Sequence, residues 1–173
     1  MHLKLLKSKN LSGQVIIPGD KSISHRSIIL SSIANGTSEI SGFLRGDDCL
    51  ATLNAFKKMG VKIEDEDKKI YVHGVGLHGL KKPIEDLDLG NSGTSMRLLA
   101  GLLSGQKFSS TLIGDSSLSS RPMKRILEPL QEMGASIFSK DNTPPLSIKA
   151  SNKLNGISYE LPVASAQVKS CIL

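Results

Sequence analysis

The sequence predicts an α/β (α+β) protein that repeats one β-α-β-α-β-β unit twice and begins a third, incomplete copy. Two amphipathic stretches end in Met-Gly, at Met59-Gly60 and again at Met133-Gly134, which lie 74 residues later. Two short strand-like segments follow each stretch. A further pattern, of a strand-like segment, a small polar loop and an apolar helix, occurs three times. Self-similarity at a fixed offset indicates duplicated structural units.

The amphipathic stretches, 48–60 and 120–134, are predicted to be helices. Their apolar residues recur at helical spacing, and each ends at glycine, a common residue at the C-terminal stop of a helix. Apolar positions of the two helices coincide at the offset of 74 residues: Leu53 with Leu127, Phe56 with Leu130, and just beyond the helices Ile63 with Ile137.

A two-stranded hairpin is predicted after each of these helices. In both copies, a turn-forming segment separates two runs that contain β-branched or large apolar residues. Coincidence of two helices that end in Met-Gly is the alternative, but the hairpin after both favours duplication. The expected strands and turns are 61–63, 64–69 and 70–72 in the first copy, and 135–138, 139–145 and 146–148 in the second.

A strand, a polar loop and an apolar helix are predicted before each amphipathic helix, and again near the C-terminal end. The positive residues Arg26, Arg97 and Lys169 occupy matching places in the three loops. The expected strands are 15–17, 87–89 and 159–161, and the expected helices are 27–33, 98–103 and one beginning near the end of the chain.

Composition favours a globular domain that binds small anions. Of 173 residues, 39% are hydrophobic and only 3% are aromatic, so the core is expected to be aliphatic. The formal net charge of +6 suggests anionic partners. No dense basic tract with interleaved aromatic residues is present, which argues against nucleic acid. Small phosphorylated or carboxylated substrates fit better.

Neither a metal site nor a membrane segment is expected. Cys49 and Cys171 are far apart, the four histidines lack zinc-site spacing, and no nucleotide-binding motif appears, so no cofactor is predicted. No stretch approaches ~20 apolar residues, and the N-terminus does not resemble a signal peptide. We therefore expect buried or half-buried cysteines in a cytoplasmic, reducing setting.

The first polar loop, 18–26, is the best candidate for an anion site. Free backbone N–H groups and the helix dipole favour an anion where a helix begins. Lys21 and Arg26 add two cations, and Ser22 adds a hydroxyl donor, so the loop suits a phosphate ester. The alternative is a solvated loop that merely caps the helix. His25 is expected to be a polar member of this loop and not a general base.

The second polar loop, 90–97, repeats this design. Gly93 allows a ligand to approach the backbone closely, Asn91 offers hydrogen bonds, and Arg97 offers charge. By itself the loop could equally be a glycine-rich turn with an asparagine cap.

Two further segments supply polar groups. Arg121 precedes a helix, with Pro122 expected in its first turn, and can hold a carboxylate or phosphate bidentately; alternatively it pairs with Asp115 on the surface. In the third loop, Ser165 and Gln167 can donate to ligand oxygens, although their spacing also suits an ordinary helix start. No catalytic triad, activated cysteine or carboxylate pair is evident.

The chain ends at Leu173 within the third apolar helix, without a glycine, cap or polar tail. A helix that stops there lacks the turns that would cover its neighbours. We therefore expect the sequence to be part of a longer chain, produced by truncation, by a split gene or as a fragment.

The motifs PGDKSISHR, LGNSGTSMR, GDSSLSSRPM and ASAQVKS, in this order and spacing, resemble the 5-enolpyruvylshikimate-3-phosphate (EPSP) synthase family of bacterial type. The resemblance covers essentially the whole chain, but family members are more than twice as long. It implies an enolpyruvyl transferase-like, inside-out α/β barrel with two domains, each of three units around a pseudo-threefold axis. Residues 1–20 would be an N-terminal strand that joins the other domain, and 21–173 would be a partial N-terminal substrate-binding domain. The C-terminal domain would be absent.

The resemblance also implies substrates and residue roles. The enzyme would transfer the carboxyvinyl group of phosphoenolpyruvate to the 5-hydroxyl of shikimate 3-phosphate, through a tetrahedral intermediate, with release of phosphate. Lys21, the catalytic candidate, would touch both substrates. The retained Gly93 would leave room for the inhibitor glyphosate. The remaining contacts would be Ser22, Arg26, Ser165 and Gln167 with shikimate 3-phosphate, and Asn91, Gly93, Arg121 and Gln167 with phosphoenolpyruvate.

The family's acid/base carboxylates would lie in the absent half, so this chain alone is expected to be inactive. One alternative is UDP-N-acetylglucosamine enolpyruvyl transferase, which normally carries Lys-Asn where this chain has Lys21-Ser22 and a reactive cysteine near the residue matching Arg121. Another is a noncatalytic phosphate- or RNA-binding module, but the discrete, serine-rich loops argue against it.

Overall fold

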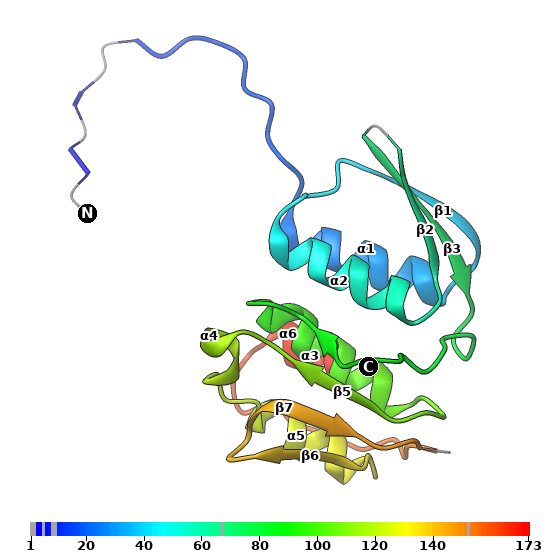
Figure 1. Ribbon diagram of the computed structural model, residues 1–173. Helices are drawn as coiled ribbons and strands as arrows, with labels where there is room; N and C mark the ends of the chain where they lie inside the picture. The colour runs from blue at the N-terminus through cyan, green and yellow to red at the C-terminus, as the bar shows by residue number, and fades with distance from the viewer. Residues whose placement is uncertain (1–2, 5, 8–9, 67, 152) are drawn as a thin grey trace.

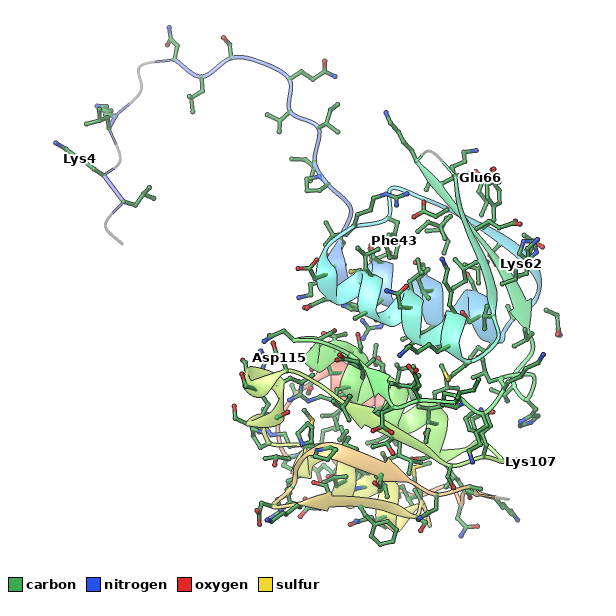
Figure 2. All side chains as sticks on the ribbon, viewed as in Figure 1. Lys4, Phe43, Lys62, Glu66, Lys107 and Asp115 are labelled. Carbon is green, nitrogen blue, oxygen red and sulfur yellow. The ribbon has the colours of Figure 1, made fainter. Side chains whose placement is uncertain are left out.

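Two sheets, each carrying helices on one face, make up the body of the chain (Figure 1). The computed structural model describes residues 3–4, 6–7, 10–66, 68–151 and 153–173. The N-terminal residues, with Lys4 labelled in Figure 2, extend away from this body.

The first unit contains two helices and a three-stranded antiparallel sheet. β3 is its central strand, and pairs Ser38 with Val72 on one side and Ile63 with Val72 on the other. The elements in chain order are α1 (Lys21–Ile33), β1 (Asn35–Ser41), α2 (Asp47–Lys58), β2 (Lys62–Glu66) and β3 (Lys69–Val75).

The second unit repeats this arrangement with one more strand and one more short helix. Its sheet has the order β4-β5-β7-β6, where β5, β7 and β6 pair as β1, β3 and β2 do in the first unit. The predicted duplication is therefore confirmed. The elements are β4 (Leu87–Asp88), α3 (Gly93–Ser104), β5 (Ser110–Ile113), α4 (Ser116–Ser119), α5 (Lys124–Glu132), β6 (Ile137–Lys140) and β7 (Thr143–Ile148). α6 (Ala166–Ile172) follows.

The two Met-Gly pairs end their helices in the same way. Gly60 and Gly134 have φ angles of 86° and 91°, a conformation that residues with side chains rarely adopt. The N–H group after each glycine donates back across the turn, Val61 to the Phe56 carbonyl at 3.1 Å and Ala135 to the Leu130 carbonyl at 2.9 Å. Each pair thus closes a Schellman-type cap that directs the chain into its hairpin.

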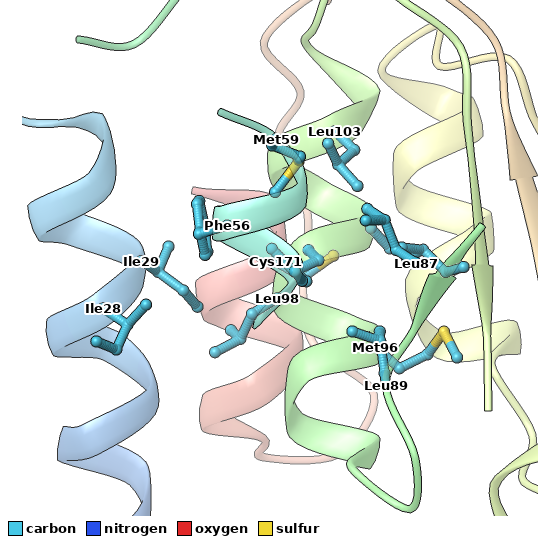
Figure 3. Close-up of a cluster of buried hydrophobic side chains, with 14 of the residues drawn as sticks. Ile28, Ile29, Phe56, Met59, Leu87, Leu89, Met96, Leu98, Leu103 and Cys171 are labelled. Atoms are coloured by element: carbon cyan, nitrogen blue, oxygen red, sulfur yellow. The ribbon is translucent and has the colours of Figure 1, made fainter. Parts of the chain in front are cut away.

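The helices of the two units pack against one another, and α3 contacts α1, α2, α5 and α6. Phe56 from α2, Met59 at the C-cap of α2 and Leu103 from α3 are buried in this mainly aliphatic core (Figure 3). Gly101 permits the close approach of α6, because a Cβ there would lie 2.0 Å from the Cys171 carbonyl oxygen. Both cysteines are free thiols. Both are buried, which agrees with the prediction from the sequence.

Two predicted strands are absent. Residues 15–17 have no regular structure and their side chains are 77–91% exposed, and 159–161 also lie outside any strand. Both segments have suitable strand composition, but a strand needs a hydrogen-bonded neighbour, and neither is paired here.

Helix starts were also predicted imperfectly. α1 and α3 begin six and five residues before the predicted starts, at Lys21 and Gly93, so Lys21 and Ser22 lie in the first turn of α1 and Gly93 lies in that of α3. Pro122 precedes α5 and is not in its first turn, and α4 was not foreseen. Small polar residues mask a helix start in the sequence because they also form loops.

No helix among the described residues is both long and apolar enough to cross a membrane. A search of the same residues for clusters of three or more histidine, cysteine, aspartate or glutamate side chains finds none that could hold a metal ion.

Candidate anion-binding site at three helix starts

α1, α3 and α6 are joined near their N-terminal ends by two arginine side chains. Arg26 on α1 donates to the Ser170 hydroxyl at 2.8 Å and to the Ala166 carbonyl at 3.5 Å, both on α6. Arg97 on α3 donates to Gln167 Oε1 at 3.1 Å, also on α6. The three loops that the sequence singled out are therefore neighbours in space.

The start of α1 presents Lys21 and Ser22. Asp20 caps this helix, because its carboxylate accepts a 2.7 Å hydrogen bond from the Ile23 N–H group. The Lys21 side chain is 52% exposed and forms an ion pair with Asp48 at the start of α2. Ser22 is exposed, and its carbonyl accepts from Arg26 at 3.4 Å. The cation is thus accessible to a ligand that can displace one surface carboxylate.

The start of α3 is closely packed around Gly93. Ser92 is the N-cap, and its hydroxyl accepts from the Ser95 N–H group at 3.2 Å. A Cβ on Gly93 would lie 2.8 Å from Arg97 Nη1 and 3.2 Å from Arg121 Nη1. Glycine at this position therefore lets two guanidinium groups approach the helix start together.

Arg121 lies at the end of α4 and is directed toward Asn91. Its Nη1 donates to the Asn91 carbonyl at 3.2 Å, and its Nη2 donates to Asn91 Oδ1. The Asn91 amide in turn donates to Asp115 Oδ2 at 2.8 Å. This hydrogen bond and backbone donors such as Leu118 N–H lower the pKa of Asp115. Arg121 thus reaches Asp115 through Asn91, which differs from the direct pairing considered from the sequence.

Arg97 is half-buried and links α3 to α6. It also donates to the Gly93 carbonyl at 3.1 Å. Burial lowers its pKa, and the nearby Arg121 and Arg125 charges add to this effect. The sequence suggested a charge offered to a ligand; in the structure the guanidinium group holds α3 and α6 together.

The start of α6 contributes Ser165 and Gln167. Ser165 is the N-cap, and its hydroxyl accepts from the Val168 N–H group at 3.3 Å. Gln167 is oriented from both ends, because Arg97 donates to its oxygen and its Nε2 donates to the Thr94 hydroxyl at 3.0 Å. Lys169 matches Arg26 and Arg97 in sequence only; its side chain is exposed.

His25 is not the polar loop residue that the sequence suggested. It lies within α1, is fully buried, and its Nδ1 is 2.7 Å from the Thr52 hydroxyl on α2. Its pKa is lowered by burial, with an opposing contribution from Asp48. Helical spacing could have predicted the burial of His25, since His25 shares a helix face with the buried Ile28, Ile29 and Ser32.

An apolar cavity of about 510 Å³ lies near these helices, lined mainly by aliphatic side chains from α1, α3 and α6. Of the predicted substrate-binding residues, Arg26 is the one that contributes to its wall. Its lining offers little to a phosphate, so the candidate site is the polar surface at the helix starts.

Comparisons with known proteins show the family to which this chain belongs. The family model for EPSP synthase (3-phosphoshikimate 1-carboxyvinyltransferase) matches residues 5–173. The 3-phosphoshikimate 1-carboxyvinyltransferase of Legionella pneumophila (strain Corby) is 61% identical over 164 residues, which are 94% of this chain and 38% of the relative. That of Hydrogenovibrio crunogenus is 57% identical over all of this chain and 39% of its own length.

A solved structure, the EPSP synthase of Acinetobacter baumannii, matches with a TM-score of 0.89 at 57% identity, over 93% of this chain and 37% of that one. The present chain thus spans slightly over a third of the length of these relatives. With a family match over nearly every residue and a fold that superposes on a solved member, the chain belongs to the EPSP synthase family.

Proposed function

We propose that this chain supplies the N-terminal part of the substrate site of a 3-phosphoshikimate 1-carboxyvinyltransferase. The observation that carries the proposal is the meeting of three helix starts with exposed Lys21 and the guanidinium groups of Arg26 and Arg121. Helix starts and cations together favour phosphorylated, carboxylated ligands. Family membership supports the same substrate class.

Shikimate 3-phosphate is assigned to the side formed by α1 and α6. Lys21, Ser22 and Arg26 would hold it from α1, and Ser165 and Gln167 from α6. The Lys21–Asp48 ion pair opposes binding only weakly, since exposed pairs contribute about 0–1 kcal/mol. A phosphate dianion can therefore compete for the ammonium group.

Phosphoenolpyruvate is assigned to the side formed by α3 and Arg121. Asn91 and Gly93 provide the helix start, Arg121 provides a planar cation for carboxylate or phosphate, and Gln167 and Lys21 reach from the neighbouring helices. The close approach of two guanidinium groups to Gly93 supports this assignment, because a ligand there meets concentrated positive charge.

In the proposed reaction, the 5-hydroxyl oxygen of shikimate 3-phosphate attacks C2 of phosphoenolpyruvate, the hydroxyl proton passes to a base, and C3 gains a proton from an acid. The tetrahedral intermediate then loses phosphate from C2 and the proton from C3. Lys21, Arg26 and Arg121 would stabilise the charge that develops on oxygen. Carboxylates suited to the proton transfers would come from the part of the relatives' length that this chain does not span, so this chain alone should bind but not turn over.

Calorimetric titration with shikimate 3-phosphate tests the proposal. We expect the wild-type chain to bind, and Lys21→Ala to bind about tenfold to a hundredfold more weakly through loss of a charge-assisted hydrogen bond. Lys62→Ala is the matched control, because Lys62 is another exposed lysine in an ion pair, on the distant β2 strand.

Failure of the wild-type chain to bind would contradict a preformed half-site. Phosphate release by the purified 173-residue chain, given both substrates, would contradict the predicted inactivity. Tight binding of RNA with a steep salt dependence would instead favour the polyanion-binding alternative.

We also propose that the reaction takes place in the cytoplasm and needs no cofactor. It would be a step of the pathway that leads to chorismate and the aromatic amino acids. The two free, buried cysteines are compatible with a reducing compartment.

A further inference from the structure

A buried chain of hydroxyl groups joins His25 to the start of α3. His25 Nδ1 lies 2.7 Å from Thr52 Oγ1, which lies 2.6 Å from Ser95 Oγ, which lies 2.6 Å from Ser92 Oγ. His25, Thr52, Ser92 and Ser95 are each 0% exposed. The chain crosses three helices without reaching solvent.

The two ends of this chain adjoin the two sides of the proposed site. His25 lies one helical turn after Lys21 and directly before Arg26, on α1. Ser92 is the N-cap of α3 and lies between Asn91 and Gly93. Because buried networks of this kind fix one arrangement of their members, the position of one helix start depends on that of the other.

The network suits a neutral imidazole. An imidazolium ion needs two acceptors, but among the described residues His25 Nε2 has no hydrogen-bond partner. The charged groups around the ring are Lys21 and Arg26 on its own helix and Asp48 on α2, while α3 presents the Ser95 hydroxyl. Two nearby cations and one partly exposed carboxylate do not compensate for a buried positive charge.

We propose that neutral His25 is a positioning residue that couples the α1 side of the anion site to the α3 side through Thr52, Ser95 and Ser92, and that protonation of His25 breaks this coupling. The inference deepens the proposed function and takes its significance from it. No part of it requires His25 to touch a substrate.

The direction of the pH dependence follows from the burial. The pKa of His25 is lowered from its ordinary value of 6.5, so the unfolded chain takes up the proton first as the pH falls. The neutral ring contributes to the free energy of unfolding. This contribution is fully present above pH 6.5 and is lost as the pH falls from 6.5 through the lower pKa of the folded state.

A ligand-free amide NMR titration from pH 7.5 to 4.5 provides the test. We expect the Lys21 and Gly93 amides of the wild-type chain to shift with one shared midpoint below pH 6.5. His25→Asn retains a short polar group that can reach Thr52 but cannot titrate in this range, so both amides should lose that transition.

Thr52→Val is isosteric and removes the connecting hydroxyl. We expect the Lys21 amide to keep its His25-dependent shift while the Gly93 amide loses it. The control is His73→Asn on the exposed hairpin, where His73 contacts Glu64 at 2.9 Å and Thr37 at 3.0 Å; the site amides should be unchanged.

Retention of the Gly93 shift in Thr52→Val, or of the shared midpoint in His25→Asn, would overturn the proposal. Calorimetry with shikimate 3-phosphate at pH 7.5 then links it to function: Thr52→Val should bind about threefold to tenfold more weakly, and His25→Asn nearly as well as wild type. If the wild-type chain binds no ligand, the proposed function fails, while the ligand-free titration still decides the coupling.

Discussion

The two repeated units share a scaffold but carry opposite charge where their second helices begin. At the offset of 74 residues, Asp47 and Asp48 of the first unit correspond to Arg121 and Pro122 of the second. Asp48 forms an ion pair with Lys21, whereas Arg121 is turned toward Asn91. Duplication therefore produced two related polar corners, one with its cation partly neutralised by Asp48 and one with Arg121 added.

The sheets of the two units differ as well. In the second unit, β4 lies parallel to β5 and pairs Leu87 with Leu112. In the first unit the corresponding edge of β1 has no fourth strand among the described residues, and the matching segment 15–17 is exposed. Three strands thus pair in the same order in both units, while among the described residues a leading strand is paired in the second unit and not in the first.

The largest expected effect concerns the shared scaffold. Phe56 and Leu130 occupy equivalent, fully buried positions. Phe56→Ala should lower the free energy of unfolding by about 3–5 kcal/mol and Leu130→Ala by about 2–5 kcal/mol, because each leaves a cavity. Urea denaturation followed by circular dichroism measures both.

If the units form one cooperative fold, both variants shift a single transition. Ile84→Ala is the control, since Ile84 is fully exposed, and its effect should stay within about 0.5 kcal/mol. Two separate transitions, each sensitive to one variant, would show that the units unfold independently. The two units would then not form one cooperative fold.

A smaller effect is expected from the charge difference. Asp48→Asn should release Lys21 and strengthen binding of inorganic phosphate about twofold to fivefold, because the carboxylate no longer competes for the ammonium group. Chemical-shift titration of the Lys21 amide provides the measurement. Asp47→Asn makes the same charge change one residue away, and an equal gain there would mean that net charge, not the ion pair, sets the affinity.

The smallest effect concerns Asp115 and the second corner. Because hydrogen bonds from Asn91 and Leu118 lower its pKa below 3.8, its stabilising contribution is present above that pH and is lost as the pH falls through the folded-state pKa. The Leu118 amide should therefore lose protection from exchange in acid, relative to an unstructured amide at the same pH. Asp115→Asn should abolish this pH dependence, with the exposed Asp86→Asn as control; an unaltered profile would argue against the Asn91–Asp115 link.

Local patterns were enough to predict much of the fold. The Met-Gly stops, the hairpins and the duplication depend on residues close in sequence, and glycine at a positive φ has few substitutes. The strands 15–17 and 159–161 were wrongly predicted because pairing depends on a partner that composition does not reveal. The helix starts at Lys21 and Gly93 were obscured because serine, asparagine and glycine serve loops and caps alike.

The sequence by itself determined the repeat, the polar loops that contain Lys21, Arg26, Gly93 and Arg121, and the positive charge of the region. Only the tertiary structure decided which of these groups are exposed and which hold neighbouring helices together. Arg97 links α3 to α6, and His25 is buried against Thr52 on α2. The sequence did not reveal these roles, because both partners are distant along the chain. Helix spacing can place a residue on a buried face, but packing against other helices decides what it meets there.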